Sequence, residues 1–317
     1  MSAGVQSAPV PFSPTRSQLT VAYSVCRGIA RKAARNFYYA FLVLPGPKRQ
    51  ALCAVYAFMR RCDDIADDPR WPVAERRQKL AEWMDSVRKA LAGHSTDDPV
   101  LLALTDTQRR YKIPPLLLDQ LAEGTAMDVQ EEVPQEDTER TPRPRSPRVL
   151  YRTFEELRGY CYRVASVVGL VCIRVFGYHD ASAEPLAEQL GLAFQLTNII
   201  RDVKEDAALG RIYIPEDDLI QFDISPAELR SPSGSARLRL LLAFEADRAR
   251  EFYRAGDKLL PLVDEDSQPA LWVLLTIYRR LLEKIASRQY DVYGEKVSLS
   301  PQEKVFILGK GLLQRLS

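Results

Sequence analysis

The stretch QLTNIIRDVKED, residues 195–206, decides the fold class of this chain. Its apolar residues recur at three- and four-residue steps, which is the period of an amphipathic helix. Asn198, Asp202 and Asp206 are spaced by four, so they share one side of that helix. Oxygen ligands in such a row suit Mg²⁺, which keeps part of its water shell and binds phosphate oxygens. A polar, solvent-facing stripe is the alternative, although this one interrupts an apolar helix.

The same helical period dominates the rest of the chain, and clear alternating strand patterns are missing. It recurs at residues 49–67, 80–91, 157–176, 238–260 and 272–285. We therefore predict a single all-α domain over residues 19–317, preceded by a flexible tail at 1–18. Within the domain, residues 130–148 contain four prolines and one aliphatic residue, so we expect a mobile insert there.

Composition excludes several classes of function. The 44 Lys and Arg residues nearly balance the 42 Asp and Glu residues, so no nucleic-acid partner is expected. His94 and His179 are the only histidines, which rules out a three-His zinc site and disfavours a His-dependent triad. The five cysteines are odd in number and form no CxxC pair, as expected for free thiols in a reducing compartment. Without a signal-peptide pattern, the expected location is the cytoplasm.

A second acidic cluster, CDDIADDP, lies at residues 62–69. Asp63 and Asp67 fall on one helical face, together with Arg60 one turn earlier and Tyr56 two turns earlier. Carboxylates near a helix C-terminus oppose the helix dipole at a cost of about 0.3–1 kcal/mol each. A divalent cation would offset that cost, and a solvated acidic helix end is the alternative.

Two acidic rows on separate helices suggest one chemistry. If they face each other across a cavity, Mg²⁺ ions and a diphosphate fit between them, with Arg201, Lys204 and Arg211 supplying further positive charge. Neutralising a leaving diphosphate lets an allylic C–O bond ionise, and the carbocation then needs a water-poor pocket. No His, Ser or Cys nucleophile is required, which agrees with the composition.

The segment YCYRVASVVG, residues 160–169, supplies an apolar face with a polar tip. As an α-helix it places Tyr160, Val164 and Val168 on one side, which would suit the wall of an apolar tunnel. A tightly packed core helix is the alternative interpretation of the same pattern.

These motifs together resemble the squalene/phytoene synthase family of head-to-head isoprenyl diphosphate synthases. The matching stretches run in the family's order and read FYYAF at 37–41, AVYAF at 54–58, DDIAD at 63–67, YCYRVA at 160–165, QLTNIIRDVKED at 195–206 and GRIYIP at 210–215. The resemblance implies an all-α isoprenoid synthase bundle around a central cavity, and the condensation of two prenyl diphosphates through a cyclopropyl intermediate. Lys296 stands where the family often has Arg.

The resemblance also implies roles for individual residues. Ligands of Mg²⁺ or Mn²⁺ would be Asp63, Asp67, Asn198, Asp202 and Asp206, and the diphosphate contacts would be Arg60, Arg201 and Arg211. Tyr160 would assist proton loss, Tyr56 and Gln195 would lie near the site, and the tunnel walls would include Phe37, Phe41, Val164, Val168, Phe194 and Tyr278.

The product is the finer expectation. We expect presqualene diphosphate or squalene from two farnesyl diphosphates, as in bacterial hopanoid-pathway members, with NADPH required only if squalene is made. Phytoene synthesis from geranylgeranyl diphosphate is the alternative, and a class I terpene cyclase or a non-enzymatic relative are more distant ones. A monomer or weak dimer is expected.

The C-terminal stretch, residues 304–316, mixes apolar residues with cations. It suggests weak peripheral contact with the inner membrane, with Lys304, Lys310 and Arg315 facing head groups while Phe306, Leu313 and Leu316 bury. A final helix packed on the core is the alternative.

Overall fold

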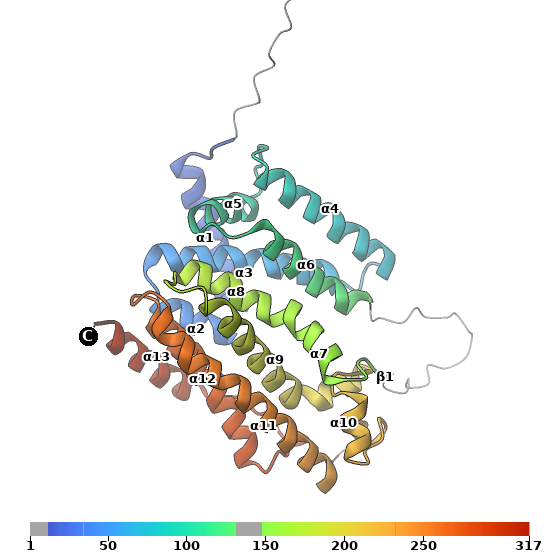
Figure 1. Cartoon of the computed structure of the whole chain (residues 1–317). Coiled ribbons are helices and arrows are strands. Elements are labelled where there is room, and N and C mark those ends of the chain that lie inside the picture. The colour runs from blue at the N-terminus through green and yellow to red at the C-terminus, as the bar shows by residue number, and fades with distance from the viewer. Residues whose placement is uncertain (1–11, 34, 131–147, 232, 317) are drawn as a thin grey trace, which may run out of the picture. The chain divides into compact units, whose positions relative to one another are not determined.

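The computed structural model describes residues 12–33, 35–130, 148–231 and 233–316. In these ranges regular structure is almost entirely helical, apart from two strands of two residues each (Figure 1). The all-α prediction is therefore confirmed. Residues 131–147, which make up nearly all of the predicted mobile insert, and residues 1–11 of the predicted tail lie outside the described ranges.

Packing divides the helices into two compact units. Unit 1 contains α1 (Arg16–Ala33), α3 (Gly46–Ala66), α4 (Val73–Leu91), α5 (Pro99–Tyr111) and α6 (Pro115–Gln130). Unit 2 contains α2 (Arg35–Val43), β1 (Arg148–Val149), α7 (Phe154–Cys161), the π-helix η1 (Tyr162–Ser166), α8 (Val167–Phe176), α9 (Ala183–Ala208), β2 (Arg211–Ile212), α10 (Glu216–Gln221), the short 3₁₀ helices η2 (Glu228–Arg230) and η3 (Leu260–Leu262), α11 (Ala236–Leu259), α12 (Gln268–Ser287) and α13 (Pro301–Leu316). Helix α1 begins before residue 19, where the sequence prediction started the domain. The domain boundaries expected from the sequence, residues 19 and 317, therefore stay a prediction.

Local sequence signals explain where the helices of unit 1 begin and end. Asp98 caps α5 by accepting hydrogen bonds from the amides of Val100 at 2.8 Å and Leu101 at 3.2 Å. The helix ends at Tyr111, and the left-handed backbone of the next residue, Lys112 (φ 50°), closes the last turn. Helix α1 packs on α5, where the Tyr23 hydroxyl donates to Asp106 Oδ2 at 2.6 Å.

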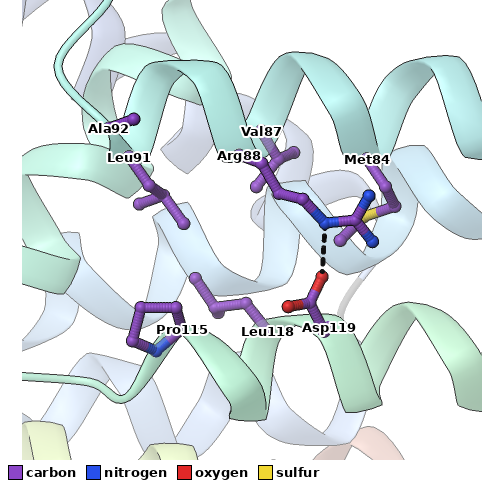
Figure 2. Close-up of a pocket in the computed structure, with 8 residues that line it drawn as sticks. All are labelled: Met84, Val87, Arg88, Leu91, Ala92, Pro115, Leu118 and Asp119. Carbon is purple, nitrogen blue, oxygen red and sulfur yellow. Dashed lines mark hydrogen bonds and ion pairs between the residues drawn. The ribbon is translucent and has the colours of Figure 1, made fainter.

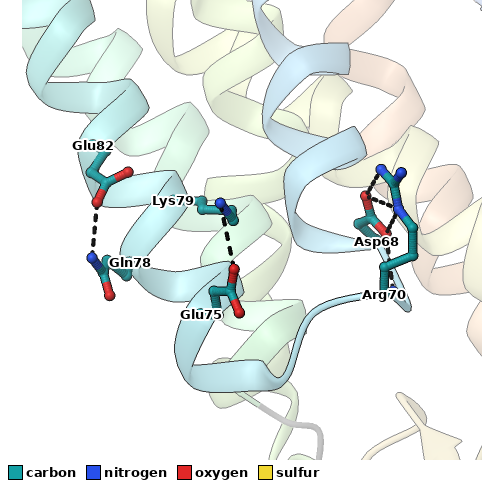
Figure 3. Close-up of polar contacts among 6 residues, drawn as sticks. All are labelled: Asp68, Arg70, Glu75, Gln78, Lys79 and Glu82. Atoms are coloured by element: carbon teal, nitrogen blue, oxygen red, sulfur yellow. Dashed lines mark hydrogen bonds and ion pairs between the residues drawn. The ribbon is translucent and has the colours of Figure 1, made fainter.

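The turn after α3 is fixed by polar contacts. Asp68 accepts a hydrogen bond from Arg70 Nε at 2.8 Å, and Arg76, which is buried, donates to the carbonyl of Ala66 at 2.9 Å. Figure 3 shows the first of these contacts beside the side-chain pairs along α4, such as Lys79 with Glu75 at 3.5 Å. The acidic end of α3 therefore leads into an ordered turn, and the pairs on α4 line an exposed helix face.

Helix α9 is the centre of unit 2, because α7, η1, α8, α11 and α12 all pack against it. One close approach needs glycine: a Cβ on Gly191 would lie 2.6 Å from the Cα of Ser166. The same approach lets Ser166 Oγ donate to the Glu188 carbonyl at 2.7 Å. This contact fixes η1, and with it the end of α7, against α9.

The helices α7, η1 and α8 run on as one 23-residue segment, Phe154–Phe176. By length and composition this segment would suffice to cross a membrane, although no single apolar run in the sequence is that long. Core helices of proteins have a similar length and composition, and 44% of the most apolar 18-residue part of this segment is buried. Its packing against α9 accounts for that burial.

Candidate active site

A cavity of about 260 Å³ in unit 2 brings together Tyr160 and the predicted polar residues of α9. Its lining consists of Tyr160 from α7, Gln195, Asn198, Ile199, Arg201, Asp202 and Asp206 from α9, and Tyr213 beyond β2. Six of these eight residues were predicted as site residues from the sequence. Their spacing of three and four along α9 puts them on one side of that helix, as the pattern indicated.

Asp202 is the most strongly held carboxylate of the cavity. It accepts hydrogen bonds from both Nε and Nη2 of Arg201, the former at 2.9 Å, and an ion pair from Lys296 Nζ at 2.7 Å. Burial raises the pKa of Asp202, but these two cations outweigh burial and hold the pKa below its ordinary value. Asp202 is therefore an anion at neutral pH.

Asp206, one turn further along α9, is in the opposite situation. Burial and then the charge of Asp202 raise the pKa of Asp206 to about 7, and Arg211 offsets only part of this rise. Next to it, Glu205 Oε2 is a shielded atom with no hydrogen-bond partner among the described residues. The negative charge at this end of the cavity therefore exceeds the positive charge of the neighbouring side chains.

That imbalance fits a divalent cation. All the predicted ligands offer oxygen donors, which is the donor type that Mg²⁺ and Mn²⁺ take. In the part of the chain that the structure describes, no three His, Cys, Asp or Glu side chains gather closely enough to hold a metal by themselves. Mg²⁺ usually binds through one or two carboxylates, with waters and substrate phosphates completing its shell, so an open oxygen row is the arrangement expected of its site.

Lys296 contacts the site without having been predicted from the sequence, whereas Lys204 makes a different contact from the predicted one. Lys296 joins Asp202 from the loop between α12 and α13 and also lies 3.4 Å from Glu205 Oε1. Its one sequence signal was its place at a position where the resembled family often has Arg. The ammonium of Lys204 instead donates to the carbonyl of Tyr293 at 2.6 Å, so it anchors a loop.

A stack of tyrosines forms the aromatic side of the cavity. The ring of Tyr160 lies 5.1 Å from that of Tyr213 and 5.5 Å from that of Tyr151. These contacts hold the Tyr160 ring, which is buried, in one orientation. Tyr213 was also missed as a site residue, although it stands in the GRIYIP motif that the sequence analysis quoted.

Three of the predicted wall residues form a second aromatic cluster. Phe194 stacks on Tyr278 with ring centres 4.3 Å apart, and Phe37 meets Tyr278 edge-on at 6.0 Å. Burial raises the pKa of Tyr278, while the nearby Arg201 and a hydrogen bond with Asn198 lower it in part. The aromatic cluster is therefore continuous with the polar row of α9. Phe41, on α2, is also buried.

The two predicted wall valines are placed differently. Val164 lies within η1 and Val168 two residues after it, and a π-helix has more residues per turn than an α-helix. The α-helical spacing that put them on the face of Tyr160 therefore does not apply. Both are half-buried, and among the described lining residues of the cavity neither valine occurs.

The acidic cluster of unit 1 occupies the last turns of α3. The amide of Asp67 donates to the carbonyl of Asp63 at 2.8 Å, so the helical turn between the two carboxylates is formed. Asp63 Oδ1 accepts from Thr125 Oγ1 of α6 at 3.4 Å. Arg60, predicted as a diphosphate contact, pairs with Asp64 at 2.5 Å. Tyr56 lies one turn before Arg60 on α3 and is half-buried.

Unit 1 also contains a cavity of about 290 Å³ between α4 and α6 (Figure 2). Met84, Val87 and Leu118 make it apolar, and Arg88 Nε pairs with Asp119 Oδ1 at 3.1 Å on its rim. No residue predicted as a site residue lines it, so the chemistry of the chain is better sought in unit 2.

Comparison with known proteins gives a consistent picture. The family model for squalene/phytoene synthase matches residues 30–303. A phytoene synthase of Mycobacterium tuberculosis is 37% identical over 93% of this chain and 92% of its own length, and a 15-cis-phytoene synthase of Synechococcus elongatus is 32% identical over 96% and 97%.

Solved structures of related synthases have the same fold as this chain. A dehydrosqualene synthase in complex with a ligand superposes with a TM-score of 0.79 at 28% identity, covering 93% of this chain and 96% of that one. The squalene synthase HpnC of Alicyclobacillus acidocaldarius gives a TM-score of 0.76 at 29% identity, covering 87% and 97%.

Proposed function

Because the chain belongs to the squalene/phytoene synthase family of prenyltransferases, we propose that it joins two geranylgeranyl diphosphates head to head to give phytoene. Head-to-head prenyl condensation is the activity of the family. The C40 substrate is supported by relatives named phytoene synthase that match almost the whole chain. The C30 reaction of farnesyl diphosphate, which is the first expectation from the sequence, stays a second candidate because two similar structures are a dehydrosqualene and a squalene synthase.

One observation carries this proposal: the cavity of unit 2 combines a row of oxygen donors, cations and the stacked rings of Tyr160 and Tyr213. Asn198, Asp202 and Asp206 would hold Mg²⁺ or Mn²⁺ there, and Asp63 and Asp67 of unit 1 are the further proposed ligands. The metal, when bound, supplies positive charge that stabilises a departing diphosphate. All five residues are oxygen donors, in agreement with that role.

The cations of unit 2 are suited to the diphosphate itself. Arg201 and Lys296 now share Asp202, and each has further N–H donors for phosphate oxygens. Arg211 lies close enough to Asp206 to lower the pKa of that carboxyl. We assign these three residues, with Arg60 of unit 1, to orienting the diphosphate.

The aromatic residues are suited to the hydrocarbon part of the substrate. Phe194 and Tyr278 are buried and stacked, so they exclude water from the position where an allylic carbocation would otherwise be quenched. The ring of Tyr160 is held in the tyrosine stack that lines the cavity, and its hydroxyl is the polar group proposed to assist proton loss.

Product analysis tests the substrate assignment. Purified protein is incubated with farnesyl or geranylgeranyl diphosphate, each with Mg²⁺ or EDTA and with or without NADPH. We expect phytoene from the C20 substrate, with Mg²⁺ and without NADPH. Conversion of the C15 substrate alone would overturn the C40 assignment in favour of the C30 candidate, and an NADPH requirement would indicate squalene. Full activity in EDTA would contradict the metal sites.

Matched variants test the proposed ligands. Asp63→Ala should lose at least about 3 kcal/mol of transition-state stabilisation, as expected for an oriented electrostatic partner. Asp64→Asn is the control, because Asp64 is adjacent, exposed and paired with Arg60. Equal losses in both variants would contradict a specific role for Asp63.

A further inference from the structure

Helix α13 presents an apolar stripe to solvent. Its packed side contacts α12 and α2, and Ile307 and Gly311 on that side are buried. On the other side Val305, Phe306 and Leu313 are 59%, 54% and 68% exposed, and Leu312 is 39% exposed. Positions 305, 306, 312 and 313 recur with the helical period, so the exposed residues form one continuous stripe. We call these four residues the α13 stripe.

Cations surround the stripe. Lys310 Nζ lies 4.8 Å and Arg280 Cζ 5.9 Å from the ring centre of Phe306, and Lys304 Nζ lies 5.7 Å from the ring of Tyr39. The only acid in the sequence of α13 is Glu303, which binds Lys284 Nζ at 3.0 Å. The electric charge around the stripe is therefore positive.

We propose that the α13 stripe docks the protein on an anionic bilayer surface. Aliphatic and aromatic side chains that project from one side of a helix enter the boundary between head groups and acyl chains. Cations beside them reach lipid phosphates while their alkyl stems stay on the apolar surface.

The structure corrects one part of the sequence prediction for this helix. The guanidinium of Arg315 donates to the carbonyls of Val43 at 3.0 Å and Leu44 at 3.3 Å, so it anchors α13 to the end of α2 and does not face lipid. Arg280 of α12 takes its place at the stripe. The side chain of Leu316 lies outside the described part.

A second copy of the chain fits the stripe less well than a bilayer. A two-fold interface brings the same patch of both subunits together. Lys304, Lys310 and Arg280 would then lie near their own counterparts, and the acid of α13 is already paired. An anionic lipid surface supplies the opposite charge without this repulsion.

Vesicle sedimentation of the full chain, without substrate, tests the proposal independently of its enzymatic function. The probes are vesicles of phosphatidylcholine alone and of phosphatidylcholine with phosphatidylglycerol, at low and high salt. We expect binding to the anionic vesicles that weakens with salt. Phe306→Ser with Leu313→Ser should lower the partition coefficient at least about tenfold. Lys310→Gln should lower it up to about fivefold, the contribution of one cation near such a surface.

Matched controls use exposed residues elsewhere. Leu240→Ser with Ile220→Ser removes side chains that are 62% and 69% exposed on α11 and α10, and should leave binding unchanged. Circular dichroism verifies that each variant is folded. The proposal is overturned if the full chain does not bind, if the control pair loses as much binding as the stripe pair, or if binding ignores lipid charge. It is also overturned if sedimentation velocity shows a dimer that the stripe pair abolishes.

Discussion

A buried cluster of three titratable side chains on α10 and α11 gives a sharp stability prediction. Arg248 Nη1 donates to Asp218 Oδ2 at 2.8 Å and to Glu245 Oε2 at 2.9 Å, and the three side chains are 17%, 9% and 3% exposed. Two carboxylates thus share one guanidinium. Burial raises the pKa of Glu245 to about 8, because the charge of Asp218 offsets part of the stabilisation that Arg248 provides. Burial therefore favours the protonated form of Glu245 in the folded protein.

The perturbation is Glu245→Gln. The pKa of Glu245 in the folded protein lies above its ordinary value of 4.5. Its contribution to the free energy of unfolding is therefore fully present below about pH 4.5 and is lost as the pH rises through about 8. The difference between these two pKa values sets an upper limit of about 5 kcal/mol on the free energy of unfolding that is lost. Sharing of the proton with Asp218 makes the loss smaller. Glutamine keeps the neutral shape, so we expect the variant to be about 1–3 kcal/mol more stable than wild type at pH 8 and nearly equal at pH 4.5.

Urea unfolding of both proteins at a series of pH values measures this difference. The reasoning is refuted if Glu245→Gln is the less stable protein at pH 8, or if the difference between the two proteins does not change with pH. An unchanged slope of unfolding free energy against urea shows that the compactness of the two proteins is equal.

The partner substitution is Arg248→Met. Methionine keeps apolar volume over the ring of Phe154, which lies 4.2 Å from the guanidinium, but leaves two carboxyl groups without their cation. We expect a loss of about 3–5 kcal/mol. Because Phe154 begins α7, which carries Tyr160, the turnover should fall as well. The control is Arg250→Met, whose ion pairs with Asp247 and Glu283 are exposed and should contribute about 1 kcal/mol or less.

Other substitutions test the site and its support. Asp202→Ala should lower kcat/KM at least about 100-fold in a product assay, while the exposed Asp247→Asn should not change it. Gly191→Ala should cost about 1–3 kcal/mol in thermal unfolding, because its Cβ would lie 2.6 Å from backbone, whereas Gly159→Ala on α7 meets open space and should be neutral or stabilising. Tyr160→Phe keeps the ring stack, so kcat should fall at unchanged KM; a wild-type kcat would contradict its role.

The polar row of α9 could be predicted because one helix holds it. Asn198, Asp202 and Asp206 need only the period of an α-helix to come together, and the structure lines one cavity with all three. Tyr160 joined them through the resemblance, since its own segment was equally consistent with a core helix. The helical class followed from the same periodicity along the whole chain.

The remaining features depend on tertiary contacts that no local pattern contains. Lys296 reaches Asp202 from a loop 94 positions later in the chain, and nothing in the spacing of residues links the two. The π-helix η1 begins and ends without a proline or glycine of its own, so nothing in the sequence showed that the α-helical period assumed for Val164 and Val168 is interrupted there. Arg315 was assigned to lipid because a charge pattern does not show which carbonyls a neighbouring helix end leaves unpaired.

One row of α9 unites the two parts of the proposed substrate site. Continuing the spacing of four backwards from Asn198 reaches Phe194, so the row passes from an aromatic residue to an amide and then to Asp202 and Asp206. At 1.5 Å per residue this row is about 18 Å long. Tyr278 stacks on its apolar end and hydrogen-bonds to Asn198, where the character of the row changes. An amphiphile with a charged head and a long hydrocarbon tail matches such a gradient. The chain length that the enzyme accepts should therefore be determined around Phe194 and Tyr278, and the diphosphate should be held at the end with Asp202 and Asp206.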